Sequence, residues 1–457
     1  MRRQAHFCQP EGPEETFRIQ KGFKMAHKTN AWLPHWSAKG WGIVLIGFFF
    51  FMFYTIWNSI TNVLFGMYEQ MYGWTQADMS YVITVAGWVS LIFVVIFGSL
   101  IKKCGAKLIC AIGLFGSAIG FVILAMATTF TMYAVGVIVF YVTMVAYATV
   151  GIGALGSSWF PRTKGSFMGF ATIGTTFASA ALNPIILGCV GAGIGVSGFF
   201  YGLAALCVIL AIIMLAFVKN TPEEAGCYPD NDKSISRAEL DAEAAAAAEY
   251  VKNSPWTTAK VLKTPQTWLI ALGTGLPMMV GAGVIATLVP TFMALGYDLL
   301  FGVTLLSTMW PIGLLGHYLI GVIDQKIGTK KTTILVVCIM GLGGLLVALL
   351  GNVMAICAVA TGMFMFGLSG TMNVCMSLTT SIFGRYDFPT AYTPISTIFN
   401  AFNFAGVSVI STIFALGGPQ VAMGAVFVIC VIAIIPTAVL PYKQIGSLLP
   451  MDDKASE

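Results

Sequence analysis

The sequence predicts an all-α polytopic membrane protein with twelve transmembrane helices in two homologous six-helix halves. Of its 457 residues, 57% are hydrophobic and only 9% are charged, whereas a soluble domain carries roughly a quarter charged residues. Most of its surface must therefore face lipid. Apolar runs of about 20 residues, which can cross the hydrocarbon layer as helices, follow one another along the chain. The short alternating segments typical of a membrane β-barrel do not occur in the sequence.

A turn motif that joins two apolar runs occurs twice. The second copy, Gly316 to Lys331, reads GHYLIGVIDQKIGTKK, and the first copy, Gly98 to Lys107, reads GSLIKKCGAK. Aligning Lys102 with Asp324 gives a separation of 222 residues (324 − 102), and aligning Gly105 with Gly328 gives 223 (328 − 105). The triplets FPR at 160–162 and FGR at 383–385 have the same separation (385 − 162 = 223). Two independent pairs at one separation indicate homologous halves, as in many transporters.

The placement of positive charge predicts the orientation in the membrane. All 24 Lys and Arg residues lie in the terminal segments or in even-numbered loops. Because positive residues stay on the cytoplasmic side, we expect a multi-pass protein of the cytoplasmic membrane with both termini inside. The expected segments are a cytoplasmic tail (1–40), the first half (41–218), a cytoplasmic linker (219–263), the second half (264–442) and a second cytoplasmic tail (443–457).

The first span, from about Trp41 to Gly66, is rich in aromatic residues and carries a polar face. Tyr54, Asn58 and Asn62 recur at four-residue steps, so they lie on one side of a helix. In lipid such a face points to other helices or to a watery cavity. The following spans of this half begin or end near Asp78, Gly98, Met126, Met132, Pro161 and Lys219.

The second half repeats this plan of six spans. Its first span, the seventh of the chain, contains Pro277 and Pro290, which predict a kinked or broken helix. The eighth span contains Trp310 and Pro311 and ends at the second copy of the turn motif. Polar residues recur in the tenth and eleventh spans. Residues that these later spans carry or end at are His317, Asp324, Asn373, Asn400, Asn403 and Pro441.

The repeated turn is predicted to act as a gate. Asp324 stands at a cytoplasmic helix end beside basic residues, so its carboxylate can pair with them in one conformation and release them in another. Gly328 permits the tight turn, and Lys102 replaces the carboxylate in the first copy, which predicts an asymmetric gate. The alternative is a charged loop that merely obeys the positive-inside rule. The expected gating residues are Asp324, Lys326, Gly328, Lys330, Lys331, Gly98, Lys102, Gly105, Arg162 and Arg385.

One ionisable side chain is predicted to lie deep in a span. All the cations fall in loops and tails, and the 19 acids fall in tails, loops or span edges. Of the four histidines only His317 is within a span, about 10 Å from Asp324 at the helical rise of ~1.5 Å per residue. An ionisable residue in a membrane is a functional candidate, and histidine can exchange a proton near neutral pH. The alternative is a neutral histidine hydrogen-bonded between helices.

The other polar residues of the spans are neutral or aromatic. A dianion would find no fixed counter-ions among them, so they suit a monoanion or an amphipathic neutral molecule. For each Thr or Asn, a hydrogen bond between helices is the alternative role. The expected substrate-binding residues are His317, Tyr54, Asn58, Tyr141, Tyr147, Trp310, Asn400 and Asn403.

The duplicated turn, the internal termini and the central linker resemble the major facilitator superfamily over residues 40 to 442. WFPRTKGSFMG after the fourth span, TPEEAG after the sixth and LKTPQTW before the seventh are similar to the oxalate/formate antiporter and monocarboxylate transporter branch. The resemblance implies the major facilitator fold and alternating access, driven by a proton gradient or by exchange. In that branch an arginine of the eighth span meets the substrate carboxylate, and alignment on Gly321 puts His317 there. The basic residue that oxalate exchangers carry in the eleventh span is missing.

We therefore expect a secondary active transporter of a small organic solute, a monocarboxylate or an aromatic organic acid, moved by proton symport or anion exchange. Efflux of amphipathic or drug-like compounds is the alternative, and a transporter-like sensor would need an output domain. The sequence contains no H-E-x-x-H, G-x-S-x-G or G-x-x-x-x-G-K-[ST] motif, so neither an enzyme nor ATP drive is expected. The ten cysteines form no C-x-x-C pair and read as buried small hydrophobes. Expected partners are the solute, protons or a counter-anion, and the lipid bilayer; no cofactor, metal or nucleic acid is expected.

Overall fold

The computed structural model describes residues 35–161, 163–233, 237–238, 241–242, 245 and 254–446. Within these ranges the side chains of Lys102, Lys164, Gln325, Arg385, Tyr386 and Pro389 are not described. Arg162 and the two chain ends lie outside the described residues.

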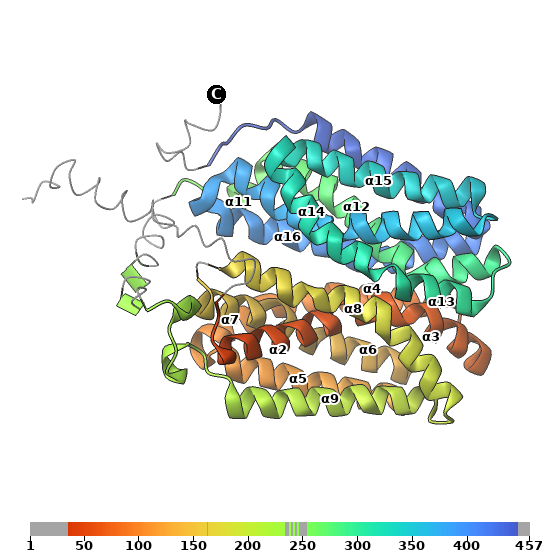
Figure 1. The fold of residues 1–457 in the computed structure, drawn as a ribbon, viewed down its shortest axis with the longest axis horizontal. Coiled ribbons are helices and arrows are strands. Elements are labelled where there is room, and N and C mark those ends of the chain that lie inside the picture. Colours follow the sequence, from red (N-terminus) through yellow and green to blue (C-terminus); the bar gives the residue numbers. More distant parts are fainter. Residues whose placement is uncertain are drawn as a thin grey trace, which may run out of the picture. The chain divides into compact units, whose positions relative to one another are not determined.

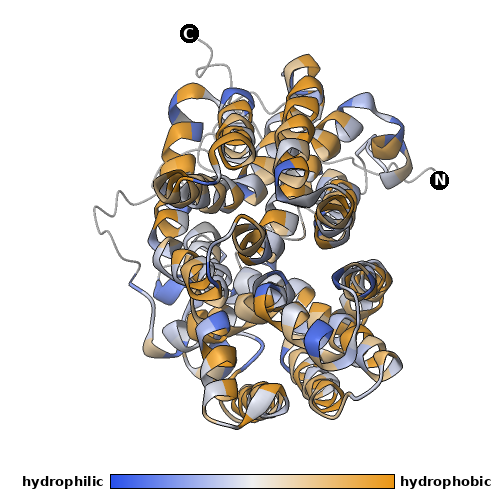
Figure 2. Ribbon diagram, turned by 90° about the vertical axis from the view of Figure 1, so that its right-hand side faces the viewer, coloured by the Kyte–Doolittle hydropathy of each residue, from blue (hydrophilic) through white to orange (hydrophobic). Residues whose placement is uncertain are grey.

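The helices of the first half form one bundle, drawn red to yellow-green in Figure 1. Each long helix is apolar enough to cross a membrane, and Figure 2, which looks along the helices, shows hydrophobic residues on nearly all of them. The helices are α2 (Ala38–Tyr54), α3 (Ile56–Tyr72), α4 (Gln76–Cys104), α5 (Ala106–Ala125), α6 (Phe130–Val145), η1 (Ala146–Gly151), α7 (Ile152–Trp159), α8 (Lys164–Gly191) and α9 (Gly195–Phe217).

The helices of the second half form another bundle, drawn green to blue in Figure 1. They are α11 (Thr258–Lys263), α12 (Pro265–Ala294), α13 (Leu299–Thr308), α14 (Trp310–Ile327), α15 (Thr329–Leu350) and α16 (Met354–Val439). The last helix is interrupted by non-helical backbone at Gly384 and Gly418. Between the halves lie two short helical turns, η2 (Glu223–Ala225) and η3 (Pro229–Asn231).

The described helices account for the predicted number of spans. Ten are long and apolar enough to cross a membrane, and the bent pair α2 and α3 makes an eleventh. The segment Thr390–Val439, counted once, has 50 residues, about 75 Å of helix against a hydrocarbon layer of ~30 Å. It divides at Gly418 into two spans, which completes the twelve. The all-helical membrane fold is confirmed.

The first span bends by 43° between α2 and α3. The bend is centred on Thr55, whose hydroxyl donates to the Phe51 carbonyl oxygen at 3.2 Å. A threonine that bonds the carbonyl four residues back commonly bends its helix. The seventh span, in contrast, is not broken, because α12 runs helically through Pro277 and Pro290. The interruption falls in the eighth span instead, between α13 and α14 at Met309.

Glycine backbone angles repeat between the halves. Gly105 has φ 80° and ψ 157°, and Gly328 has φ 84° and ψ 150°. These left-handed φ values strain any residue with a Cβ. Two further positive-φ pairs keep the separation of 223: Gly73 with Gly296 (296 − 73) and Gly195 with Gly418 (418 − 195). The repeat therefore extends to the turns that precede the second and the last span of each half.

The interior of the first half is aromatic. Eleven of the twelve largest fully buried side chains belong to it, and only Phe292 belongs to the second half. In the aromatic run of the first span, Phe50 packs on a ring of η1, Phe53 on a ring of α5, and Trp57 on rings of α6 and α9. Most of that run therefore builds the bundle interior instead of a binding surface.

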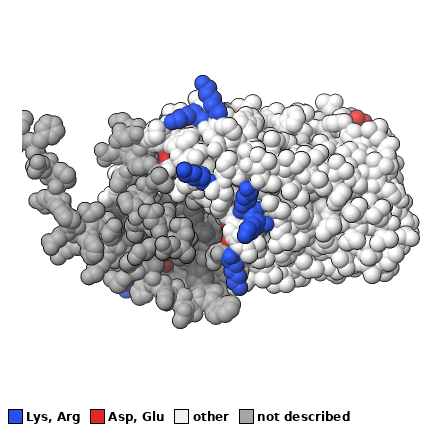
Figure 3. Space-filling view, turned by 90° about the horizontal axis from the view of Figure 1, so that it is seen from above, with Lys and Arg blue, Asp and Glu red and all other residues white. Residues whose placement is uncertain are grey.

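The linker contacts both halves near the repeated FPR and FGR triplets. At its start, Asp230 accepts hydrogen bonds from the backbone N–H and the hydroxyl of Thr163. At its end, the Ser254 hydroxyl donates to buried Asp387, and Trp256 packs on Phe383 with ring centroids 5.3 Å apart. We call the end of the helices that carries these contacts the linker end, and the other the opposite end. On the face in Figure 3, the lysines and arginines lie toward the linker end.

Candidate functional site

Three flanks join the two halves through hydrogen bonds, which we call the cross-half seam. On the first flank, α4 meets α16. The Thr84 hydroxyl donates to the Phe404 carbonyl oxygen at 2.9 Å and also contacts the Ser408 hydroxyl. The Trp88 indole N–H donates to the Ala401 carbonyl oxygen at 3.0 Å. The Phe404 ring lies where a Cβ on Gly87 would be, so the glycine allows this close approach.

The second flank lies between α3 and α12. The Asn62 amide donates to the Ile285 carbonyl oxygen at 2.6 Å and accepts from the Val289 N–H at 3.1 Å. The Thr61 hydroxyl donates to the Ala286 carbonyl oxygen at 3.2 Å. Thr61 and Asn62 are both buried. This flank therefore consists of side chains of one half bonded to the backbone of the other.

The third flank lies between α8 and the eighth span. The Ser307 hydroxyl donates to the Ala180 carbonyl oxygen at 2.7 Å. Gly313 of α14 lies against Thr176 of α8, since a Cβ on the glycine would be 3.1 Å from the threonine methyl carbon. Ser307 is the repeat partner of Thr84 (307 − 84 = 223). The first and third flanks are therefore equivalent contacts made by the two halves.

The cross-half seam closes only the opposite end. In the described part of the chain, the bonds of the seam lie between the middle of the spans and the opposite end. Toward the linker end the same helix faces are exposed. On α4 the face of Thr84 and Trp88 continues to Ile92 and Val95, which are 64% and 70% exposed. On α16 the face of Ala401 continues to exposed Thr397. Among the described residues, no hydrogen bond joins these helices of the two halves toward the linker end.

A polar cluster lies where the halves begin to separate. The Tyr54 hydroxyl of α2 donates to Asn400 Oδ1 of α16 at 2.7 Å. Asn403 is the second amide beside that hydroxyl; it is 3% exposed, and its Oδ1 has no partner among the described residues. A buried amide oxygen without a donor is costly. The cluster thus holds a free acceptor for a hydrogen-bond donor.

Aromatic rings form one wall beside this cluster. Tyr141 of α6 packs edge-on against Phe404 of α16, with centroids 5.6 Å apart. The two rings belong to different halves, so the contact depends on their relative position. Asn58 is half-buried on α3. Tyr54 lies one turn from it toward the linker end, and Asn62 lies one turn from it toward the opposite end. The structure therefore brings Tyr54, Asn58, Tyr141, Asn400 and Asn403 to the same part of the boundary.

His317 lies on the eighth span just below the third flank. It is half-buried, and its Nε2 is buried without a hydrogen-bond partner among the described residues. Gly313, one turn toward the opposite end, meets the first half, and Gly321, one turn toward the linker end, faces open space. His317 therefore lies one turn beyond the contact that Gly313 makes with the first half.

Tyr147 and Trp310 are placed differently from the other predicted binding residues. Tyr147 is fully buried inside the first half, with its hydroxyl 3.1 Å from Ser117 and its ring on Phe50. It cannot touch a solute between the halves in this conformation, so it is a correction to the predicted lining. Trp310 begins α14 and is half-buried beside the interruption at Met309.

The predicted gating residues around the second turn are held by neutral groups. Asp324 accepts a hydrogen bond from the Ser377 hydroxyl at 2.8 Å, and its other oxygen is buried without a described partner. Lys330 donates to the Leu440 carbonyl oxygen at 3.0 Å. Lys326 and Lys331 are exposed, and no described lysine forms an ion pair with Asp324. The carboxylate is thus tied to the tenth span and not to its basic neighbours.

The first turn is held by the linker. The Lys107 N–H donates to Asn220 Oδ1 at 2.9 Å, and Gly105 lies directly against the same amide. Gly98 lies near Val150 with ordinary contact distances for an added Cβ. Arg162 lies outside the described residues, and the side chains of Lys102 and Arg385 are likewise not described, so their gating role stays a prediction.

Several residues that join the halves were missed by the sequence analysis, namely Thr61, Thr84, Trp88, Ser307 and Ser408. Most of them bond to backbone groups of the other half, and such acceptors leave no pattern in a sequence. The repeat is one usable signal, because Thr84 and Ser307 occupy equivalent positions 223 residues apart (307 − 84).

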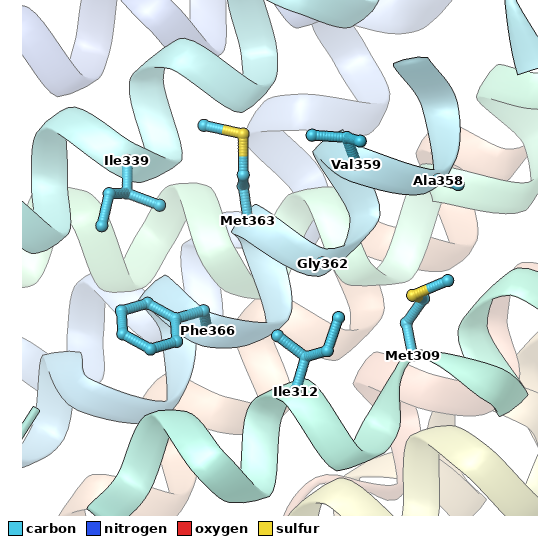
Figure 4. A pocket seen from close by; sticks show the side chains of 8 residues that line it. All are labelled: Met309, Ile312, Ile339, Ala358, Val359, Gly362, Met363 and Phe366. Carbon is cyan, nitrogen blue, oxygen red and sulfur yellow. The ribbon is translucent and has the colours of Figure 1, made fainter. Parts of the chain in front are cut away.

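A surface groove lies elsewhere, away from this cluster. It has a volume of about 570 Å³ and lies between the eighth, ninth and tenth spans (Figure 4). Only apolar residues line it, among them Met309, Ile339 and Phe366, so nothing there can orient a charged solute. Among the described residues, no group of three or more His, Cys, Asp or Glu side chains could hold a metal ion.

Comparison with known proteins gives one family and one fold. A sequence model of the Major Facilitator Superfamily matches residues 42–382. A bacterial homologue of the human lysosomal transporter Spinster, inward-facing and occupied, has a TM-score of 0.66 and 14% identity over 88% of this chain and 96% of that chain. Its inward-facing unoccupied form has a TM-score of 0.65 and 13% identity over 88% and 97%. No curated protein sequence matches the chain.

Proposed function

Because the chain belongs to the Major Facilitator Superfamily and is thus a secondary transporter, we propose that it carries a small organic acid across the cytoplasmic membrane by alternating access. The proposed solute is a monocarboxylate or an aromatic organic acid, moved with a proton or in exchange for another anion. The narrower branch of oxalate/formate antiporters and monocarboxylate transporters, which the sequence resembles, is part of this proposal.

The observation that carries the proposal is the environment of His317. Among His, Lys, Arg, Asp and Glu, it is the one side chain placed away from the ends of the described spans, and its buried Nε2 has no partner among the described residues. A protonated imidazole there would donate a hydrogen bond to a carboxylate, and charge-assisted bonds of this kind are about twice as strong as neutral ones. His317 therefore has the chemistry to bind the solute or to carry the coupled proton.

The surroundings favour one negative charge on the solute. No Lys or Arg occurs in the middle of any span, so a second carboxylate would be buried without a counter-ion. Tyr54, Asn400 and Asn403 offer neutral hydrogen-bonding groups, and the Tyr141 and Phe404 rings offer an apolar wall. These groups suit an acid with an apolar or aromatic body.

Efflux of amphipathic compounds is the second candidate, and the ring pair between the halves supports it. Tyr141 and Phe404 belong to different halves and lie edge-on, and together with the neutral amides they could hold an apolar molecule without a carboxylate. In that case His317 would serve only in packing.

The proposed cycle places the linker end in the cytoplasm. The cross-half seam joins the halves at the opposite end, and no described hydrogen bond of the seam lies toward the linker end, which supports an inward-open carrier. Solute would enter or leave His317 and the Tyr54 cluster from the linker end in this state. Both termini and the linker would then be cytoplasmic.

The test measures solute binding to the purified protein by thermal shift at pH 5.5 and 7.5. Probes are propionate, benzoate, oxalate and the cationic amphiphile ethidium, because binding to the folded state alone raises the melting temperature. We expect stabilisation by benzoate and propionate, stronger at pH 5.5, where more His317 is protonated. His317→Ala should weaken benzoate binding by about 10- to 100-fold, the effect of one charge-assisted hydrogen bond.

The matched control is His35→Ala, which removes an exposed histidine next to the first span and should leave binding unchanged. His317→Gln, which keeps a neutral hydrogen-bonding group, should retain part of the affinity and lose its pH dependence. Stabilisation by ethidium alone, with an unchanged response in His317→Ala, would overturn the carboxylate proposal in favour of efflux.

A further inference from the structure

Pro290 in α12 leaves one backbone carbonyl oxygen that the helix itself cannot satisfy. Proline has no N–H, so the carbonyl oxygen four residues earlier, that of Ala286, loses its helical donor. The Thr61 hydroxyl of the first half donates to this oxygen at 3.2 Å. One side chain of α3 thus supplies the bond that Pro290 removes from α12.

The next pair of backbone groups in α12 is bridged by Asn62. In a regular helix the Val289 N–H would donate to the Ile285 carbonyl oxygen. Here Asn62 Oδ1 accepts from that N–H at 3.1 Å, and Asn62 Nδ2 donates to that oxygen at 2.6 Å. The amide therefore bonds both members of the pair. Thr61 is 0% and Asn62 is 3% exposed, so water does not reach these bonds.

We propose that Thr61 and Asn62 are gating residues that hold the opposite end closed by completing the hydrogen bonds of α12 around Pro290. The inference rests on the proposed alternating access, but not on the solute. When the first span leaves α12, the Ala286 carbonyl oxygen and the side chains of Thr61 and Asn62 lose their partners, whereas the Val289 N–H and the Ile285 carbonyl oxygen keep each other as partners within the helix. They regain partners only when water enters the opened end, because buried polar groups without partners are costly.

This arrangement favours two states and disfavours a half-open one. When the opposite end is closed, Thr61 and Asn62 bond to the backbone of α12 across the boundary. When that end is fully open, water hydrates the same polar groups. A partly separated boundary that excludes water satisfies neither condition. The chain therefore uses a proline in one half and an amide in the other to make closure cooperative.

The experiment measures distances between spin labels in purified protein without solute, with Cys104 and other accessible cysteines replaced by serine. One label pair sits at the opposite end, at Met71 of α3 and Leu300 of α13, which are 59% and 66% exposed. A second pair sits at the linker end, at exposed Leu108 of α5 and Lys331 of α15. The variants are Thr61→Val and Asn62→Leu.

In Thr61→Val we expect the ratio of long to short distances at the opposite end to rise about fivefold, the effect of one typical hydrogen bond. Asn62→Leu, which removes two bonds, should shift it further, and the linker-end pair should move closer in parallel. The matched control is Thr287→Val. Thr287 is equally buried in α12, but its hydroxyl bonds the Gly283 carbonyl oxygen of its own helix, so its distances should match the wild type.

Pro290→Ala provides an independent check that does not alter the first half. The new N–H at residue 290 gives the Ala286 carbonyl oxygen a donor within the helix, so Thr61→Val should add little in that background. The proposed gating role of Thr61 and Asn62 would be overturned if the distances were unchanged in Thr61→Val and Asn62→Leu. It would also be overturned if Thr61→Val shifted the distances as much in the Pro290→Ala background as in the wild type. A failure of the benzoate test would leave these distances untouched, so the two proposals fail separately.

Discussion

Two tyrosines of the first half show how position decides the role of a residue type. The Tyr54 hydroxyl bonds Asn400 across the boundary, whereas the Tyr147 hydroxyl bonds Ser117 inside one bundle. Both were predicted from sequence as binding residues, because both are polar aromatic residues within a span. Periodicity gives the face of a helix but not the neighbour of that face.

The two tyrosines allow a matched test of this assignment. Tyr54→Phe should weaken benzoate binding by about 2- to 10-fold, since it removes one hydrogen bond and keeps the ring. Tyr147→Phe should leave binding unchanged and lower stability by ~1 kcal/mol, because its hydroxyl bonds only Ser117. Binding is measured by titration and stability by thermal melting. Equal effects of the two variants on binding would contradict the proposed site.

At the residue scale, the sequence was sufficient to find a residue that stands out by its type alone. His317 could be singled out because it is the one histidine within a span; the structure places it half-buried on α14, and its role in binding stays a prediction. Thr61 and Asn62 could not be assigned as gating residues, because their acceptors are backbone groups exposed by Pro290. A proline predicts an unsatisfied carbonyl oxygen in its own helix, but it does not predict which helix donates a hydrogen bond to that oxygen.

At the element scale, close helix packing in the second half depends on glycines. Gly406 of α16 and Gly283 of α12 lie against each other, and a Cβ on either would overlap backbone oxygen of the facing helix. Small residues allow such approach in membranes, where packing and hydrogen bonds replace the hydrophobic effect. The first half, in contrast, is filled by aromatic side chains.

Gly406→Ala should therefore destabilise the second half, because overpacking a tight contact costs typically ~1–3 kcal/mol. The melting temperature and the yield of folded protein should both fall. The matched control is Gly424→Ala in the same helix, where an added Cβ meets nothing within 4 Å and alanine is the better helix former. If both variants melt alike, tight packing at Gly406 is not important for stability.

Element existence was predictable, but element shape was less so. Apolar runs bounded by charged or glycine turns gave spans whose ends agree with the helices to within a few residues at most positions. The bend at Thr55 and the interruption at Met309 were not predicted. The seventh span, predicted to be kinked or broken, is not broken, since α12 continues through Pro277 and Pro290. Such irregularities depend on whether a neighbouring helix satisfies the freed backbone, which is tertiary information.

At the scale of the whole molecule, the repeat is the strongest link between sequence and structure. Two motif pairs predicted a separation of 223 residues, and glycine turns and the bonds of Thr84 and Ser307 follow the same separation. The sequence could not give the conformation, because closing one end or the other uses the same helices and the same residues.

The orientation in the membrane can be tested with a native cysteine. Cys104 is exposed at the linker end, so a membrane-impermeant maleimide should label it in inside-out vesicles and not in right-side-out vesicles. Cys8 and Cys227, which also belong to the expected cytoplasmic segments, are replaced by serine in both proteins. The control is Gln70→Cys with Cys104→Ser in addition; Gln70 is exposed at the opposite end and should show the reverse pattern. The opposite result for both positions would place the termini outside the cell.

The distribution of charge along the spans has an electrical consequence. Away from their ends the spans hold no Lys, Arg, Asp or Glu, and moving one charge through the membrane field is worth about 2.3 kcal/mol per 100 mV. In the proposed cycle the empty carrier, with a neutral His317, moves no fixed charge through that field. The rate at which the empty carrier returns is then insensitive to voltage, and any current comes from the charge of the transported solute and ions. A monoanion carried with one proton is electrically silent, whereas exchange of anions of unequal charge is electrogenic.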